Sequence, residues 1–182
     1  SLLLCTGTFL SAENLHSRAE LRLHNEGYSD SEIKLVVRVL EEASREGIPS
    51  QLLLGRVQEG AAKHVPAGRL AAVLERDIEY LQQARRSLTE IENGPALIAD
   101  PARWQRAANM LAAGISVSEL TALGRICTAV PEEFRPLSVL YVSLVKWGLE
   151  SETTIAVAEA LVSSPIPASE YEGVSDLFRN AR

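Results

Sequence analysis

The segment Gly114-Ile115-Ser116 separates two stretches of helical periodicity and shows how the chain is built. A glycine just past a helix end lets the backbone enter the left-handed region, and a serine or proline then favours the start of a new helix. We call this pattern the cap motif. Its other copies are Gly27-Tyr28-Ser29, Gly47-Ile48-Pro49, Val65-Pro66, Val130-Pro131, Gly148-Leu149 and Ile166-Pro167. The recurrence predicts short helices connected in series.

Between the cap motifs, apolar residues recur every three or four positions, which is typical of amphipathic helices, and strand-like alternation is almost absent. The longest periodic stretch runs from about Ala67 to Asn93. It carries an apolar ladder that Asp77 interrupts, made of Leu70, Leu74, Leu81, Ala84, Leu88 and Ile91. The sequence predicts an all-α fold, an irregular stack of about eight short antiparallel helices that is α-solenoid-like or an orthogonal bundle.

Glycine and proline in Asn93-Gly94-Pro95 end the long helix and suggest a boundary between subdomains. We expect an N-terminal helical subdomain over residues 13–93, a linker over 94–101 and a C-terminal helical subdomain over 102–182. The second subdomain is expected to hold helices near 102–113, 117–129, 132–147, 151–163 and 169–181.

A short internal echo pairs Leu54-Gly55-Arg56-Val57 with Leu123-Gly124-Arg125-Ile126. Duplication of a stacked unit explains the match, and so do shared demands of helix packing. We expect Gly55 and Gly124 to permit close approach of helices. The segment from Gly55 to Lys63 only superficially resembles a phosphate-binding loop, because its lysine does not directly follow the second glycine.

The chain has 182 residues and a formal net charge of −6. Basic residues are mostly arginine, and they form no patch beyond Arg85-Arg86. Because nucleic-acid binding depends on neutralising phosphates with clustered basic residues, a nucleic-acid partner is not expected. Aromatic residues are only 5% of the chain, so the core is predicted to consist mainly of Leu, Val, Ile and Ala.

Residues 1–12 resemble the end of an export signal, with an apolar run followed by the small pair Ser11-Ala12. The run is shorter than the roughly 20 apolar residues that a membrane-spanning helix needs. We expect an exported protein of the periplasm or cell envelope. Two other interpretations are open: an apolar segment docked on the core, and a lipoprotein modified at Cys5.

Cys5 and Cys127 are the two cysteines of the chain. The apolar pattern around Cys127 favours a buried thiol that behaves as a small hydrophobic residue. A disulfide with Cys5 and a reactive thiol are the alternatives.

His16, Glu20 and His24 follow one another at helical spacing, but the two histidines lie about 12 Å apart along a helix and cannot share one ion. The sequence favours a polar helix face for them and a helix C-terminal position for His64. No catalytic, cofactor-binding or metal-ligating residue is assigned, and whether the chain is an enzyme is left open.

Large aromatic residues gather between residues 104 and 147, and the helix that ends near Trp147 is apolar around most of its circumference. Such a helix is expected to be central in a core, or to form a binding surface or pocket if it is exposed. The candidate residues are Trp104, Phe134, Tyr141 and Trp147.

The sequence favours a non-catalytic, helical-repeat-like interaction or scaffold protein that binds a protein or peptide partner. One alternative is a carrier of small molecules or lipids with an apolar pocket in the C-terminal half. Another is a hydrolase that uses converging carboxylates, which would require two such groups within about 10 Å.

Overall fold

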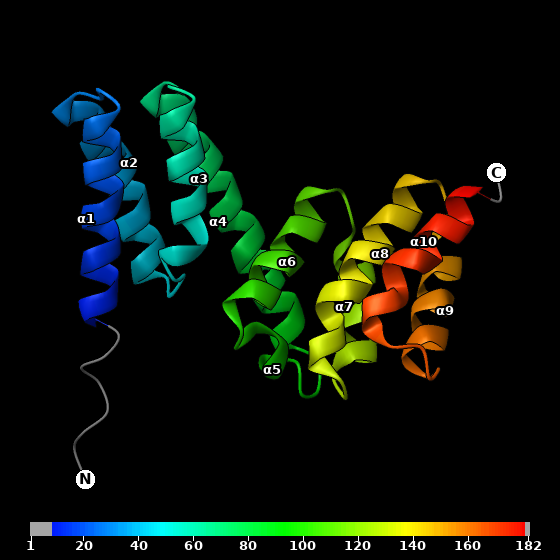
Figure 1. Ribbon diagram of the computed structural model, residues 1–182. Helices are drawn as coiled ribbons and strands as arrows, with labels where there is room; N and C mark the ends of the chain where they lie inside the picture. The colour runs from blue at the N-terminus through cyan, green and yellow to red at the C-terminus, as the bar shows by residue number, and fades with distance from the viewer. Residues whose placement is uncertain (1–8, 181–182) are drawn as a thin grey trace, which may run out of the picture. The chain divides into compact units, whose positions relative to one another are not determined.

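The computed structural model describes residues 9–180 and most of their side chains from Leu15 onward (Figure 1). This part of the chain contains ten α-helices, two short 3-10 helices and no strand, which confirms the predicted all-α fold. It divides into two compact units, with the boundary between Glu79 and Tyr80, inside a continuous helix. Each unit is described separately.

The first unit contains α1 (Phe9–Asn25), α2 (Asp30–Arg45), α3 (Gln51–Ala62) and the first part of α4 (Ala67–Thr89). α1 packs against both α2 and α3. The α1–α2 turn and the α3–α4 turn lie at the same end of the unit (Figure 1). The Tyr28 hydroxyl joins them, because it donates a hydrogen bond of 2.6 Å to the carbonyl oxygen of Val65.

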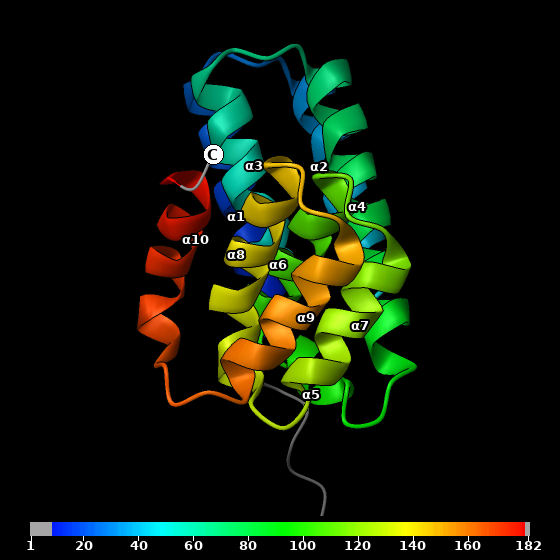
Figure 2. The same ribbon diagram turned by 90° about the vertical axis from the view of Figure 1, so that its right-hand side faces the viewer.

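The second unit continues from α4 through the rest of the described chain. Its elements are α5 (Pro95–Ile98), α6 (Pro101–Ala112), α7 (Val117–Cys127), the 3-10 helix η1 (Pro131–Glu133), α8 (Phe134–Lys146), α9 (Ser151–Val162), η2 (Ala168–Glu170) and α10 (Tyr171–Asn180). Helix α8 is central: it contacts α6, α7, α9 and α10, and Figure 2 shows it between α9 and α10.

Five of the seven cap motifs form the same hydrogen-bonded turn. In each, the residue after the helix has a positive φ and its N–H bonds back to a carbonyl of the last turn. The N–H of the following apolar residue reaches one carbonyl further back, which is the Schellman arrangement. At Gly114 the φ angle is 91°, and the N–H of Ile115 lies 3.1 Å from the oxygen of Met110. The apolar residues of these turns are Tyr28, Ile48, Val65, Ile115 and Leu149.

His64 takes the glycine position in the turn before Val65-Pro66, with a φ angle of 48°. Left-handed backbone is less favourable for a residue with a side chain, so this turn carries a conformational cost that the glycine turns avoid. Val130-Pro131 and Ile166-Pro167 are different, because no described residue beside them has a positive φ. There the chain forms a 3-10 helix before the next α-helix. Helices α8 and α10 therefore begin at Phe134 and Tyr171, later than the sequence predicted.

Two cap motifs also share a serine–glutamate box at the start of the next helix. The N–H of Ser29 donates to Glu32 at 2.9 Å, and the N–H of Ser116 donates to Glu119 at 2.8 Å. Both belong to the pattern Gly-x-Ser-x-Ser-Glu, which begins at Gly27 before α2 and at Gly114 before α7. Such boxes satisfy N–H groups that have no partner inside the helix. Helices α2 and α7, one in each unit, thus begin in the same way.

The apolar ladder predicted for α4 is buried as expected, with Leu74, Leu81 and Leu88 all at 0% exposure. Asp77, which interrupts the ladder, accepts a hydrogen bond of 2.9 Å from Arg56 of α3. An ion pair therefore satisfies the one acidic residue on this helix face. Within the described residues, no helix is both long and apolar enough to cross a membrane.

Residues 94–101, where the sequence placed a linker, contain α5 and belong to the second unit. Leu97 is fully buried, and the Arg103 side chain donates to the carbonyls of Ala96 and Leu97. A Cβ atom at Gly94 would collide with the carbonyl oxygen of Leu88, so only glycine fits this turn. Helix α4 accordingly ends at Thr89, earlier than the sequence predicted.

The two glycines of the Leu-Gly-Arg echo have different surroundings. A Cβ atom at Gly124 would lie 2.7 Å from Leu88 and 2.9 Å from Ile91, which confirms close approach there. For Gly55 the expectation is wrong, because no atom would lie within 4 Å of its Cβ. In α3 the close approach occurs at Gly60, where a Cβ would lie 2.6 Å from Leu70. The echo therefore does not mark equivalent positions of the two units.

Alanine substitutions at the two echo glycines should have opposite effects on the free energy of unfolding. Gly55→Ala should stabilise the protein by up to about 1 kcal/mol, because alanine is a better helix former and meets no neighbour. Gly124→Ala should destabilise it by about 1–3 kcal/mol through overpacking against Leu88 and Ile91. Urea denaturation of both variants measures the difference. Equal changes in the free energy of unfolding would contradict the assignment of Gly124, and not Gly55, as a contact glycine.

Candidate functional site

The aromatic residues that the sequence singled out belong mostly to the core of the second unit. Phe134 is 0%, Tyr141 1% and Trp104 5% exposed, whereas Trp147 at the end of α8 is half-buried. The Trp104 indole N–H donates to the Leu81 carbonyl at 2.8 Å, and the guanidinium of Arg85 lies 5.6 Å from the ring centroid. Trp104, Phe134 and Tyr141 are therefore part of the buried interior of the second unit.

The Tyr141 hydroxyl belongs to a polar cluster that joins three helices. Glu119 of α7 accepts hydrogen bonds from Tyr141 of α8 at 3.0 Å and from Ser151 of α9 at 2.5 Å. Its second oxygen accepts from the N–H and hydroxyl of Ser116 at 2.8 and 2.5 Å. One carboxylate thus completes the box of α7 and also bonds to the middle of α8 and to the first residue of α9. Sequence reasoning missed this role, although Gly-x-Ser-x-Ser-Glu contained the signal.

The electrostatics of this cluster favour an ionised Glu119. Burial alone would raise its pKa, but hydrogen bonds from Ser116, Ser151 and Tyr141 outweigh burial and lower the pKa below its ordinary value. Burial and the neighbouring carboxylate raise the pKa of Tyr141 well above its usual range. At neutral pH the pair is a carboxylate with a protonated phenol, which suits a structural hydrogen bond.

A second buried cluster lies around the thiol of Cys127. The Tyr171 hydroxyl of α10 donates to Glu133 at 2.7 Å, and Cys127 is 0% exposed. Burial, with a smaller effect of the Glu133 charge, raises the pKa of Cys127 to about 12. Reactivity at cysteine requires the thiolate, which burial and the raised pKa disfavour at physiological pH. The predicted burial is confirmed; Cys5 lies outside the described residues.

In the first unit, His16 contacts two serine hydroxyls that are distant in sequence. Its Nε2 atom lies 3.0 Å from Ser50 Oγ and 3.3 Å from Ser44 Oγ, and the two hydroxyls are 2.8 Å apart. A histidine beside a serine is also the geometry of a nucleophile and its base. Here Ser50 is only 5% exposed and Ser44 occupies its hydroxyl, so the contacts tie α1 to the α2–α3 turn.

The other two histidines are exposed. His64 Nε2 lies 3.9 Å from Glu26, which brings the ends of α1 and α3 together. Among the described residues, no group of three His, Cys, Asp or Glu side chains is arranged to hold a metal ion.

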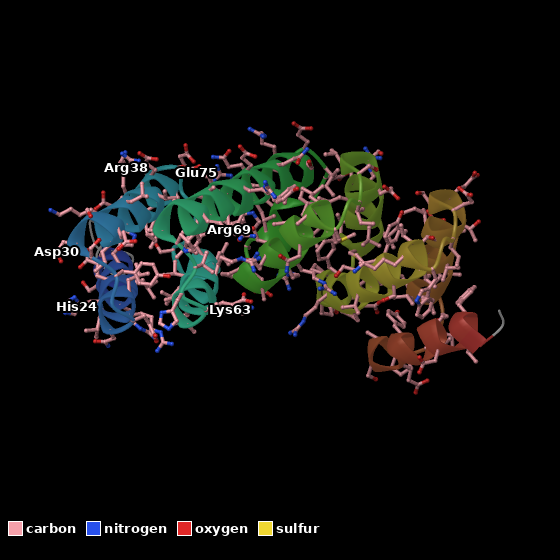
Figure 3. All side chains as sticks on the ribbon, turned by 90° about the horizontal axis from the view of Figure 1, so that it is seen from above. His24, Asp30, Arg38, Lys63, Arg69 and Glu75 are labelled. Carbon is pink, nitrogen blue, oxygen red and sulfur yellow. The ribbon has the colours of Figure 1, made fainter. Side chains whose placement is uncertain are left out.

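Charged side chains of both signs cover the exterior of the first unit (Figure 3). The figure labels His24, Asp30, Arg38, Lys63, Arg69 and Glu75, all of which are exposed. Positive and negative groups alternate over α1–α4, so the labelled side chains form no large field of one sign. Steering of a strongly charged partner requires such a field.

Comparison of the chain with protein-family models, curated proteins and solved structures found no significant match.

Glu119→Gln should destabilise the protein by about 1 kcal/mol at pH 7, because the amide cannot replace a carboxylate that accepts four hydrogen bonds. The folded pKa of Glu119 is depressed, so its contribution is complete above the ordinary glutamate value of 4.5 and is lost as the pH falls through the folded pKa. The difference between the two proteins should shrink in acid. Thermal unfolding across this pH range measures it.

Glu32→Gln is the matched control, because Glu32 occupies the same place in the Gly-x-Ser-x-Ser-Glu pattern that begins at Gly27. Among the described residues, its side chain accepts hydrogen bonds from Ser29 alone. Its effect should be smaller than that of Glu119→Gln. A larger effect would contradict the role of Glu119 in joining three helices.

Cys127 should resist alkylation. In a Cys5→Ser background at pH 8, iodoacetamide should modify the folded protein at least about a hundredfold more slowly than the protein in denaturant, because the buried thiol remains protonated. Mass spectrometry over time measures the two rates. Similar rates in both conditions would show that the thiol is accessible and ionised.

Proposed function

We propose that this protein is a non-catalytic interaction or scaffold protein, built from helical hairpins and located in the periplasm or cell envelope, that binds a protein or peptide partner. One observation carries the proposal: the side chains best suited to chemistry are committed to holding helices together. Glu119 and Tyr141 connect α7 with α8, and His16 and Ser50 connect α1 with the α2–α3 turn. The helix surfaces then remain for recognition.

The order of turns supports a repeat-like construction. In each unit a Gly-x-Ser-x-Ser-Glu turn begins the second helix of a hairpin, before α2 and before α7. A Schellman turn later in the unit joins α3 to α4, and another joins α8 to α9. Proteins made of stacked helical hairpins leave extended helix surfaces, and these surfaces commonly bind peptides and proteins.

The outer sides of α1 and α10 are the proposed contact surfaces. Leu21 of α1 is 60% exposed and Leu177 of α10 is 70% exposed. The buried core of a protein interface is depleted in charged residues, so exposed apolar side chains are the candidates for a contact surface. α1 packs on α2 and α3, and α10 packs on α8, so each leucine lies on a helix that its unit already holds in place.

Export is the part of the proposal that rests on residues 1–12. The apolar run and the small pair Ser11-Ala12 support it. α1 begins at Phe9, so cleavage after Ala12 would remove only the first turn of this helix. Mass spectrometry of the N-terminus in fractionated cells tests this part: an intact chain confined to the cytoplasm would refute export without affecting the proposed binding.

A photo-crosslinking residue placed at Leu21 or Leu177 should trap a partner in cells that normally produce the protein. We expect a covalent adduct of defined mass from at least one position, detected by immunoblotting and identified by mass spectrometry. Lys34 of α2 is the matched control, because it is exposed and polar. Adducts that are absent at both leucines, or equally abundant at Lys34, would contradict the proposed surfaces.

A further inference from the structure

Helix α9 buries only a small part of its apolar side chains. Of its seven apolar residues only Ala158 and Leu161 are buried, whereas α2, which also has seven, buries five. An amphipathic helix of a soluble protein normally turns its apolar side to the core. The apolar residues of α9 that are exposed or half-buried are Ile155, Ala156, Val157, Ala160 and Val162.

The outer side of α9 has no helix over it in the described part of the second unit. α9 packs on α7 and α8, and Figure 2 shows it in front of both. The helical period places Ala156 and Ala160 one turn apart, on the side opposite the buried Ala158. Both are exposed, and Val157 beside them is half-buried. We call Ala156, Val157 and Ala160 the α9 face.

The segment that contains the α9 face carries charge of one sign only. Residues 147–178 include six acidic residues and no Lys, Arg or His. The rest of the chain has 18 acidic residues and 18 lysines and arginines, so this segment accounts for the whole net charge of −6. Glu152 and Glu159 lie on α9 itself, and both are exposed. Charge of one sign attracts partners of the opposite sign and repels those of the same sign.

Two classes of occupant do not match this charge. A second copy of the chain docked through its own α9 would place Glu152 and Glu159 against the same residues, and like charges across an interface are unfavourable. A membrane surface of anionic lipids would repel the segment for the same reason. A helix with an apolar side and flanking basic residues matches both the apolarity and the charge. Small side chains such as Ala156 and Ala160 also allow a second helix to approach closely.

We propose that the α9 face binds an amphipathic helix of a partner protein, whose apolar side lies on Ala156, Val157 and Ala160. Lysine or arginine residues that flank this apolar side meet Glu152 and Glu159. The inference rests on the proposed function, because it takes the partner to be a protein or peptide. It adds a surface other than the outer sides of α1 and α10 and assigns the chemistry of the segment that binds there.

Two synthetic amphipathic peptides test the charge of the occupant. Both have the same side of leucine and alanine, flanked by lysine in one peptide and by glutamate in the other. Each is titrated into isotope-labelled full-length protein, and nuclear magnetic resonance follows the amides of residues 151–166. The lysine peptide should give saturable shifts that weaken at high ionic strength, and it should bind at least about tenfold more tightly than the glutamate peptide. Equal affinities, or no saturable shift in α9 with the lysine peptide, would overturn the proposal.

Variants of the protein make the test specific for the α9 face. Ala156→Arg should weaken binding of the lysine peptide at least about tenfold, because it places a large cationic side chain on this face. Ala72→Arg is the matched control, since Ala72 is an exposed alanine of α4, and its affinity should equal that of the wild type. Retained chemical-shift dispersion shows that each variant folds. Equal affinities of the two variants would overturn the proposal.

A photo-crosslinking residue at Ala160, compared with those at Leu21 and Leu177, separates this inference from the proposed function. Mass spectrometry should locate the Ala160 crosslink in a helix-forming partner segment with flanking lysine or arginine. An Ala160 adduct with a second copy of the chain would overturn the inference. Adducts at either leucine with none at Ala160 would overturn it and leave the proposed function standing. The absence of adducts at all three positions would contradict both.

Discussion

The helix-ending turn, with two backbone N–H groups bonded back to the last turn of the helix, is the interaction on which the described structure depends. It requires one residue in the left-handed region and places the next, apolar residue against the helix that has just ended. Ile48 and Ile115, the apolar residues of two such turns, are 1% and 4% exposed. These two turns therefore reverse the chain and each contributes a residue to the core, whereas Tyr28, Val65 and Leu149 of the other turns are partly exposed. His64 shows that the geometry, rather than glycine itself, is essential.

Polar side chains connect these turns within each unit. Tyr28 joins the α1–α2 turn to the α3–α4 turn, and Glu119 joins the start of α7 to α8 and α9. Partly buried hydroxyls and carboxylates are costly unless they are paired, so such contacts also specify which turns meet. Residues that would suggest catalysis in isolation, such as His16 beside Ser50, serve the same purpose. This use of polar groups is the observation on which the proposed interaction or scaffold function rests.

Much of the fold could be predicted because its signals are local. Helical periodicity and the caps located α2 and α7, and the ladder on α4 was buried as expected. Predictions that needed long-range information were less reliable. The sequence predicts a linker over residues 94–101 because glycine and proline are common in linkers. In the structure, glycine is required at position 94 because a Cβ atom there would collide with the Leu88 carbonyl oxygen. The candidate site was equally limited, since apolarity alone does not separate a buried aromatic residue from an exposed one.

The sequence by itself determined the helix class, the places where the chain reverses and the burial of Cys127, because backbone conformation and amphipathic periodicity depend on neighbouring residues. Only the tertiary structure decided which side chains meet. It separated Gly55 from Gly124 and brought the Tyr28 hydroxyl to the Val65 carbonyl, although the local sequences give no sign of either result. The physical reason is that contacts between helices depend on the rotation and offset of packed surfaces, which residues distant in the chain set together.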